Sequence, residues 1–432
     1  MPLLEELKPK NNSAASYFPV SANSANNKYD WETVVGFFIK SLHSLKLEKN
    51  IESLDDFKKL CKTHFTNKLD GEPFWHVIEK MYFDNEQVLN IAPEMQVLKV
   101  LNPDKSNSGD ERLTSLFNSL MGDVEVANAP KAQLNFLEQE VKKVFDSPLV
   151  TNKNQKIRKQ HIAYLPFLSA QFQQDLKFLV SYPEHFLQNI KAFLKLYGFL
   201  YTAQLSLNIK GWAQKPEVKP CYFILDSEKA SKERTKLQLH GHKQVIESSY
   251  ALFPYLALNE SLQDTKTAIS PLWQLMDEIK DTDIEALNSY ANKFYTDRNL
   301  TSQQKQPTTK DESIKHLTQL FVEQFKKGTT RETAFNNFVK ATRETLIKPF
   351  EQNRRRAGSF LVLNQDYLLL LTNLCIGENE KLRLHELLIE FQKRGVFFDK
   401  SSEECLIDLF ERMGNVERMS DSGDAVYVKK TI

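Results

Sequence analysis

Residues 357–432 constrain the fold most strongly, because three successive helical patterns there lead into two short alternating strands. The almost wholly apolar run 367–376 predicts a buried helix, and Gly377 after it suits a left-handed C-terminal cap. Residues 384–394 carry leucine and phenylalanine at i, i+3, i+4 and i+7. This spacing predicts a helix with one core face that stops at Gly395.

A third helix is predicted to begin at Ser401, because residues 401–404 form the Ser-x-x-Glu pattern of a capping box, and to end before Gly414. Alternating residues then predict two strands, near 416–419 and 425–428. The turn between them is rich in residues that suit tight backbone geometry: Ser420, Asp421, Ser422, Gly423 and Asp424. Three helices and a hairpin predict a winged-helix-like (α+β) domain in which this turn is the wing.

The third helix occupies the place of a recognition helix, yet it is acidic. Residues 399–414 hold five acidic and two basic side chains, a formal charge of −3. Specific DNA binding draws much of its affinity from Lys and Arg at phosphates, so this helix is a poor match for a DNA groove. It is equally a candidate for docking a partner protein through Glu403, Asp408 and Glu411. Both roles remain open at this point.

The length of 432 residues exceeds the usual size of one hydrophobic core, so several domains are expected. Thirteen glycines are few for such a chain and favour helices. The fold is predicted to be mainly α, with one short internal strand region at 221–225. The predicted parts are a flexible N-terminal tail (1–29), a multi-helix body (30–298), a linker or loop (299–312), a helical connector (313–356) and the winged-helix-like domain (357–432).

The charge of the chain is unevenly distributed. The formal net charge is +1, while residues 360–432 hold nine basic and thirteen acidic side chains, or −4, which leaves +5 for the rest. Four cysteines lie far apart without a CxxC pair and are expected to be reduced core residues. No apolar run approaches the roughly 20 residues of a membrane span, so we expect a cytoplasmic protein without a membrane partner.

Motifs for nucleotide and metal chemistry are missing or weak. No glycine is followed by lysine, which excludes a standard GxxxxGK phosphate loop. Neither GxGxxG, GxSxG nor HExxH occurs. No cofactor, metal or catalytic residue is therefore predicted. The weak candidates for a metal-dependent nuclease centre are Asp226, Glu228, His240 and His242.

Three basic clusters are candidates for contacts with double-stranded DNA. Lysine and arginine bind backbone phosphates, although such clusters are more often solvated faces. The arginine triplet is the best placed, because it directly precedes the C-terminal domain. The clusters are Lys153, Lys156, Arg158 and Lys159; Lys229, Lys232, Arg234 and Lys236; and Arg354, Arg355 and Arg356.

Two segments carry a resemblance to a known family. Residues 394–430 read RGVFFDKSSEECLIDLFERMGNVERMSDSGDAVYVKK, with an Arg-Gly pair, a Phe-Asp pair before the third helix, SDSGDA and a Tyr-Val-Lys ending. Residues 221–244 read CYFILDSEKASKERTKLQLHGHKQ, a strand, an acidic turn and a Ser-Lys-x-Arg segment. In both of these segments, the sequence resembles the DptG (DndG) family, the G subunits of DNA-phosphorothioation-dependent restriction systems.

The resemblance implies a component of a bacterial antiviral defence complex that damages DNA lacking phosphorothioate modification. It also implies F and H partner subunits, which are expected to supply ATPase and nicking activity. We therefore expect a non-catalytic adaptor subunit that contacts DNA. Two alternatives stay open: a cryptic metal-dependent nuclease subunit, and a winged-helix transcription regulator of the defence operon, which the acidic third helix and the long helical body disfavour.

Overall fold

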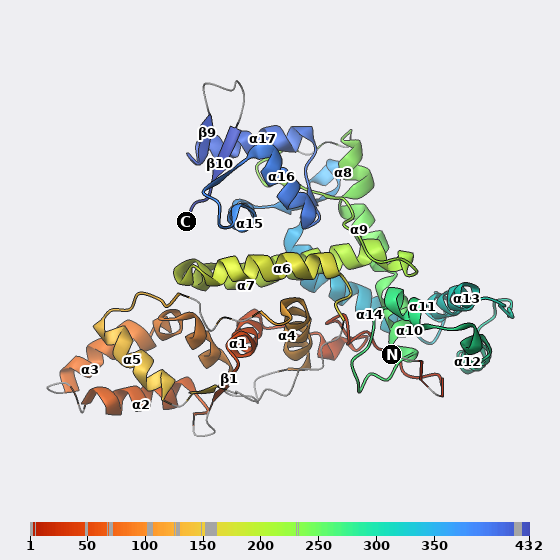
Figure 1. Cartoon of the computed structure of the whole chain (residues 1–432), viewed down its shortest axis with the longest axis horizontal. Coiled ribbons are helices and arrows are strands. Elements are labelled where there is room, and N and C mark those ends of the chain that lie inside the picture. The colour runs from red at the N-terminus through yellow and green to blue at the C-terminus, as the bar shows by residue number, and fades with distance from the viewer. Residues whose placement is uncertain are drawn as a thin grey trace. The chain divides into compact units, whose positions relative to one another are not determined.

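The computed structural model describes residues 3–4, 6–47, 51–66, 68, 72–101, 107–124, 126, 130–147, 149–151, 162–229, 231, 233–418 and 426–432. The chain is mainly helical, as predicted, and contains a few small sheets (Figure 1). None of the described helices is both long and apolar enough to cross a membrane.

The chain forms two compact units. Unit 1 comprises Met1–Asn27, Lys159–Phe172 and Lys195–Ile432, and unit 2 comprises Lys28–Arg158 and Gln173–Leu194. Helices α6 (Pro166–Val180) and α7 (Pro183–Asn208) contribute residues to both. The predicted body therefore does not correspond to one unit. The finer predicted boundaries stay predictions.

Unit 2 is built of helices, several of which surround an aromatic-rich core. Phe57, Trp75, Phe83 and Phe145 lie in this core, and Phe57 meets Phe145 edge-on with ring centroids 6.2 Å apart. A short antiparallel pair joins β1 (Leu45–Leu47) to β2 (Leu149–Thr151). The helical elements are α1 (Trp31–Leu42), α2 (Leu54–Thr66), α3 (Glu72–Ile78), η2 (Glu79–Phe83), η3 (Gln87–Asn90), η4 (Pro93–Val100), α4 (Ser108–Met121) and α5 (Phe136–Asp146).

Unit 1 has a second helical core, in which Phe294 stacks on Phe321 with ring centroids 4.3 Å apart. The predicted linker 299–312 joins two helices of this same unit rather than two units. The helical elements that precede the C-terminal segment are η1 (Ser24–Asn26), η6 (Ile209–Gly211), α8 (Thr235–His240), α9 (His242–Ser249), α10 (Leu252–Ser261), α11 (Leu272–Glu278), η7 (Asp281–Asp283), α12 (Ile284–Asp297), α13 (Lys310–Glu323), α14 (Glu332–Thr342), η8 (Arg343–Ile347) and η9 (Lys348–Phe350).

The N-terminal segment differs from the flexible tail that its polar composition predicts. Tyr17, Phe18 and Val20 are each at most 5% exposed. The Tyr201 hydroxyl donates to the carbonyl of Tyr17 at 2.8 Å, and the Tyr17 hydroxyl donates to the carbonyl of Ile269 at 2.8 Å. A few aromatic and branched side chains thus suffice to fix a segment whose other residues are polar, because each buries a large apolar area.

The C-terminal segment contains the predicted helices and hairpin. Strand β10 pairs antiparallel with β9 and also with β7, which the sequence analysis did not predict, so the sheet order is β7-β10-β9. The predicted turn residues Ser420, Asp421, Ser422, Gly423 and Asp424 lie outside the described part of the chain. Along the chain (Figure 1) the elements are α15 (Gln365–Ile376), β7 (Lys381–Arg383), α16 (Leu384–Lys393), β8 (Val396–Phe397), α17 (Lys400–Arg412), β9 (Val416–Arg418) and β10 (Val426–Lys429).

The predicted capping box at Ser401 is wrong. Helix α17 begins at Lys400, and the carboxylate of Asp399 caps it by accepting the backbone N–H of Ser402 at 3.1 Å. A carboxylate at this position satisfies an otherwise unpaired N–H and interacts favourably with the positive end of the helix dipole.

The predicted internal strand is confirmed as β3 (Cys221–Tyr222) and β4 (Ile224–Leu225), and it pairs with C-terminal strands. Strand β3 runs parallel to β8, and β4 runs parallel to β6 (Ser359–Leu363). Strand β6 also forms an antiparallel hairpin with β5 (Glu351–Asn353). The internal strand therefore packs with the C-terminal elements of unit 1. As a result, residues 221–244 and 394–430, the two segments that carry the family resemblance, are in contact through β3 and β8.

Candidate functional site

The arginine triplet forms the turn of the β5–β6 hairpin. The backbone N–H of Arg354 donates to the carbonyl of Gly358 at 2.8 Å, and Asn353 accepts the N–H of Arg355 through its side chain at 2.8 Å. Arg355 adopts φ +54° and Gly358 φ +100°, left-handed values that let the chain reverse within a few residues. Arg355 and Arg356 are exposed, so both guanidinium groups are accessible.

Arg354 has a different role from its two neighbours. Its guanidinium donates to the backbone carbonyl of Asp226 at 2.5 Å and lies 3.4 Å from the Asp226 carboxylate. Gln352 donates to the same carboxylate at 3.0 Å. These bonds hold the hairpin against the turn that follows β4. Lys229, three residues further on, is exposed, so the structure brings two of the predicted basic clusters together.

The second basic cluster is divided between surface and interior. Lys236 is exposed, and its ammonium lies 5.5 Å from the ring centroid of Tyr222. Arg234, predicted as a DNA contact, is instead largely buried, with a side chain 12% exposed. Lys232 lies outside the described residues, and so does the whole first cluster, Lys153, Lys156, Arg158 and Lys159.

Arg234 is the centre of an ion-pair cluster. Its guanidinium pairs with Glu228 and Asp399 and donates to the Ser402 hydroxyl at 2.7 Å. The Ser402 hydroxyl in turn donates to the Glu228 carboxylate at 2.9 Å. Burial opposes the charged form of Arg234, but its hydrogen bonds to Asp399 and Glu228 outweigh burial and raise its pKa. The cluster joins the segment after β4 to the first turn of α17.

The four candidate metal ligands do not converge on one point. Asp226 contacts Arg354 and Glu228 contacts Arg234. His240 Nδ1 lies 3.3 Å from the side-chain amide oxygen of Gln244, and His242 lies 3.2 Å from Glu351. Among the residues that the structure describes, no group of three or more His, Cys, Asp or Glu could hold a metal ion.

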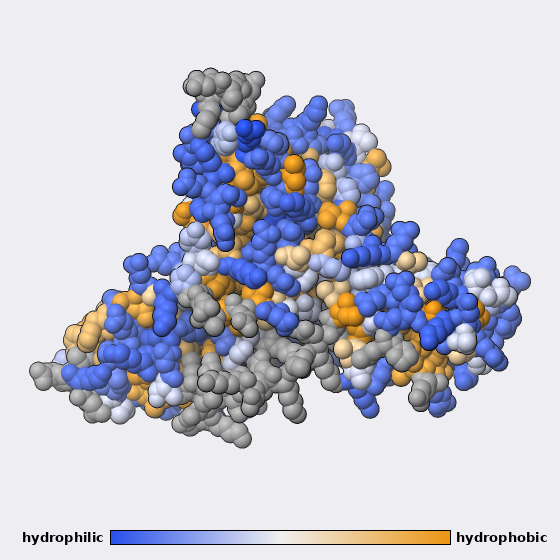
Figure 2. All heavy atoms as spheres, viewed as in Figure 1, coloured by the Kyte–Doolittle hydropathy of each residue, from blue (hydrophilic) through white to orange (hydrophobic). Residues whose placement is uncertain are grey.

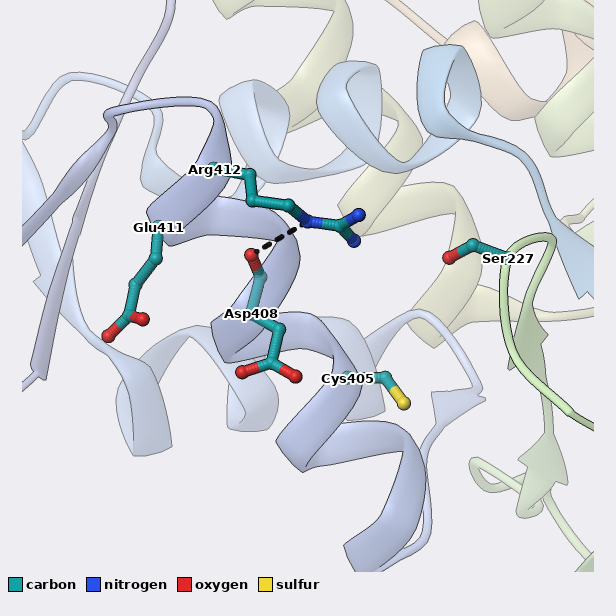
Figure 3. A pocket seen from close by; sticks show the side chains of 5 residues that line it. All are labelled: Ser227, Cys405, Asp408, Glu411 and Arg412. Carbon is teal, nitrogen blue, oxygen red and sulfur yellow. Dashed lines mark hydrogen bonds between the residues drawn. The ribbon is translucent and has the colours of Figure 1, made fainter.

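The acidic helix α17 borders a hollow of about 690 Å³, lined by Ser227, Cys405, Asp408, Glu411 and Arg412 (Figure 3). Arg412 Nε donates to the backbone carbonyl of Asp408 at 3.2 Å, as the dashed line in Figure 3 shows. Burial, then the charges of Glu228 and Asp408, raise the pKa of the Cys405 thiol. A protonated thiol is a poor nucleophile, so this hollow lacks an activated cysteine.

The three candidate docking residues share α17 but differ in exposure. Asp408 and Glu411 are exposed and Glu403 is half-buried. Glu411 forms an ion pair with Arg418 of β9. Over the C-terminal elements, the face of the molecule drawn in Figure 2 is mostly hydrophilic, with only small apolar areas.

A face of the sheet β7-β10-β9 that gathers basic, aromatic and acidic side chains was missed by the sequence analysis. Lys381 and Lys429 both form ion pairs there with Glu417 of β9, at 2.9 and 3.1 Å. The register places Arg383 opposite Tyr427 and Lys381 opposite Lys429. Arg383 donates to the Tyr427 hydroxyl at 3.0 Å, and the Lys381 ammonium lies 5.1 Å from the Tyr427 ring centroid. Basic or aromatic residues alternate with an apolar residue in Lys-Leu-Arg (381–383) and in Tyr-Val-Lys (427–429). This alternation indicates a shared face only once β7 is known to pair with β10.

No known protein-family model matches the chain, and no curated protein matches it either.

Proposed function

We propose that this chain is a DNA-contacting adaptor subunit without catalytic activity of its own. The observation that carries the proposal is the arrangement of Arg355, Arg356 and Lys229, three exposed cations on two turns that the bonds between Arg354 and Asp226 hold side by side. Such a surface offers donors to successive phosphates and carries no base information.

The topology of the C-terminal elements supports the same proposal. Apart from the short strand β8, which pairs with β3, the order is helix, strand, helix, helix and hairpin, and the first strand lies beside the last. This order is the one expected of a winged helix. In such a domain the hairpin and its sheet offer a second contact surface. Here one face of that sheet carries Lys381, Arg383, Tyr427 and Lys429, with Glu417 paired to both lysines, whereas α17 remains acidic.

The partners belong to the proposal through the resemblance of residues 221–244 and 394–430. We propose that the adaptor works in a phosphorothioation-dependent restriction complex whose F and H subunits supply ATPase and nicking activity. The acidic residues of α17 would then face a basic partner surface. The nuclease alternative has little support, because its four candidate ligands each contact a different partner.

The test is duplex binding by a triple variant, Arg355→Ala, Arg356→Ala and Lys229→Ala. Arg354 is left intact because it holds the hairpin. Duplex affinity should fall similarly for unrelated sequences, and the slope of log affinity against log salt should flatten by about 0.9 for each phosphate that the variant no longer neutralises.

A matched control removes three other exposed cations of unit 1, by Lys266→Ala, Lys315→Ala and Lys327→Ala. This control changes the net charge by the same amount as the triple variant. If DNA binds only at the hairpin surface, the control should leave the slope of log affinity against log salt nearly unchanged. Equal slopes for the wild type and the triple variant would refute a DNA contact at this surface.

A further inference from the structure

A second hollow lies in unit 1, away from the C-terminal elements. Its volume is about 480 Å³, within the range of small-molecule sites. One wall is the face of α13 that carries His316, Gln319 and Glu323, and the other is the loop that includes Ser302 and Lys305. Further lining residues are Tyr255 and Lys326.

The loop that forms one wall is held in place at several points. The carboxylate of Glu323 accepts the backbone N–H groups of Thr301 at 3.1 Å and Ser302 at 3.0 Å. Further along, Asn288 donates to the carbonyl of Pro307 at 2.9 Å. The hollow is therefore bordered by an anchored segment and not only by exposed side chains.

The charges around the hollow favour an anion. Lys305 and Lys326 are exposed, and within the described residues neither forms an ion pair. Glu323 is the acidic residue of the lining, and burial opposes its charge, but its bonds to Ser302 and Thr301 lower its pKa overall. The charge of Lys326 also lowers this pKa. Two lysines and one ionised carboxylate leave a formal charge of +1 around the hollow.

His316 adds a polar group that lacks a partner within the described part of the chain. The residue is 5% exposed, and its Nδ1 is buried without a hydrogen bond. Burial first, and then the charge of Lys305, lower the pKa of this imidazole, so the ring is neutral near pH 7. A neutral imidazole has one nitrogen that accepts a hydrogen bond. Buried polar atoms are nearly always paired, so an unpaired one beside a hollow points to a ligand.

We propose that this hollow binds a phosphate monoester. A phosphate monoester carries several acceptor oxygens for the two lysines, and its second pKa near 6 leaves a fraction with an O–H that can donate to imidazole. Two sources share this chemistry: a free mononucleotide, and the 5′-phosphate at a DNA end. This site is independent of the proposed DNA contact at the β5–β6 hairpin.

The test is calorimetric titration of the full chain with inorganic phosphate, dTMP and thymidine. Phosphate and dTMP should bind and thymidine should not. The variant with Lys305→Ala and Lys326→Ala should bind at least about tenfold more weakly, because two charge-assisted hydrogen bonds are removed. The control with Lys315→Ala and Lys327→Ala, two exposed lysines beside the hollow that do not line it, should bind as the wild type does.

His316→Phe provides a second readout. It should weaken dTMP binding several-fold while the melting temperature stays equal or rises, because a buried polar atom without a partner is removed. Oligonucleotides with a 5′-phosphate or a 5′-hydroxyl distinguish the two sources of phosphate. If the strand with the 5′-phosphate binds more tightly than dTMP, and the strand with the 5′-hydroxyl binds no more tightly than dTMP, the ligand is a DNA end. The proposal is overturned if neither phosphate nor dTMP binds at millimolar concentration. It is also overturned if the lysine variant binds dTMP as tightly as the wild type does.

Discussion

Arg234 differs from the other predicted basic contacts because its charge is used inside the protein. Replacement by methionine keeps much of the stem but leaves Glu228, with a side chain 3% exposed, and Asp399 without their cation. We expect Arg234→Met to lower the free energy of unfolding of unit 1 by roughly 3–5 kcal/mol, the usual cost of removing one partner of a buried pair. Urea denaturation of the wild type and the variant measures this difference in the free energy of unfolding.

Two further variants isolate the charge effect of that substitution. Lys236→Met, on the same segment but exposed, should change stability by less than about 0.5 kcal/mol. Adding Glu228→Gln to Arg234→Met should recover part of the stability, because one uncompensated charge is removed. A decrease below about 1 kcal/mol for Arg234→Met would mean that water enters and solvates the carboxylates.

At the scale of elements, Gly395 connects α16 to β8 where no larger residue fits. It adopts φ +84°, and a Cβ there would lie 2.2 Å from Nε2 of Gln204. Gln204 cannot swing away freely, because it donates to the carbonyl of Lys219 at 2.8 Å and accepts the N–H of Lys219 at 2.9 Å.

We expect Gly395→Ala to destabilise unit 1 by about 1–3 kcal/mol, from left-handed strain and displacement of Gln204. The thermal melting temperature of the full chain measures this. Gly414→Ala is the control: it has φ +74° but nothing within 4 Å of its added Cβ, so it reports strain alone. Equal destabilisation in the two variants would show that the contact with Gln204 contributes nothing.

At the scale of the whole molecule, the acidic α17 and the basic turns predict separate surfaces for partners and DNA. The variant with Glu403→Lys, Asp408→Lys and Glu411→Lys should abolish pull-down of the partner subunits. Its DNA affinity should stay equal or rise, because repulsion from phosphate is removed. Pull-down and duplex titration on the same preparation measure both quantities.

The matched variant reverses three exposed acids elsewhere in the C-terminal segment, Asp366→Lys, Glu378→Lys and Glu380→Lys, with the same change in net charge. It should keep partner binding if the docking surface is specific to α17. Abolished DNA binding with intact pull-down in the α17 variant would contradict the docking role and indicate a helix that enters DNA.

The sequence by itself determined the local elements of the C-terminal segment. Apolar spacing and helix-stopping glycines placed α15 and α16 within two residues of their observed bounds, and the alternation around the SDSGDA turn placed the hairpin. These features are short-range: periodicity decides which face is buried, and only glycine takes a left-handed cap without strain. The internal strand at 221–225 was predicted for the same reason, as an apolar run after a Pro-rich break.

Only the tertiary structure decided what those elements contact. Partners such as Arg234 and Asp399 are 165 residues apart along the chain, and no local pattern records that a cation will be buried against an acid. The same holds for β7, too short and polar to be predicted as a strand until β10 lies beside it. The N-terminal segment was misjudged because composition reports average polarity, whereas a few buried side chains such as Tyr17 and Phe18 fix it. Long-range pairing decided which of the predicted basic residues stay on the surface, as Arg355 and Arg356 do, and which are buried, as Arg234 is.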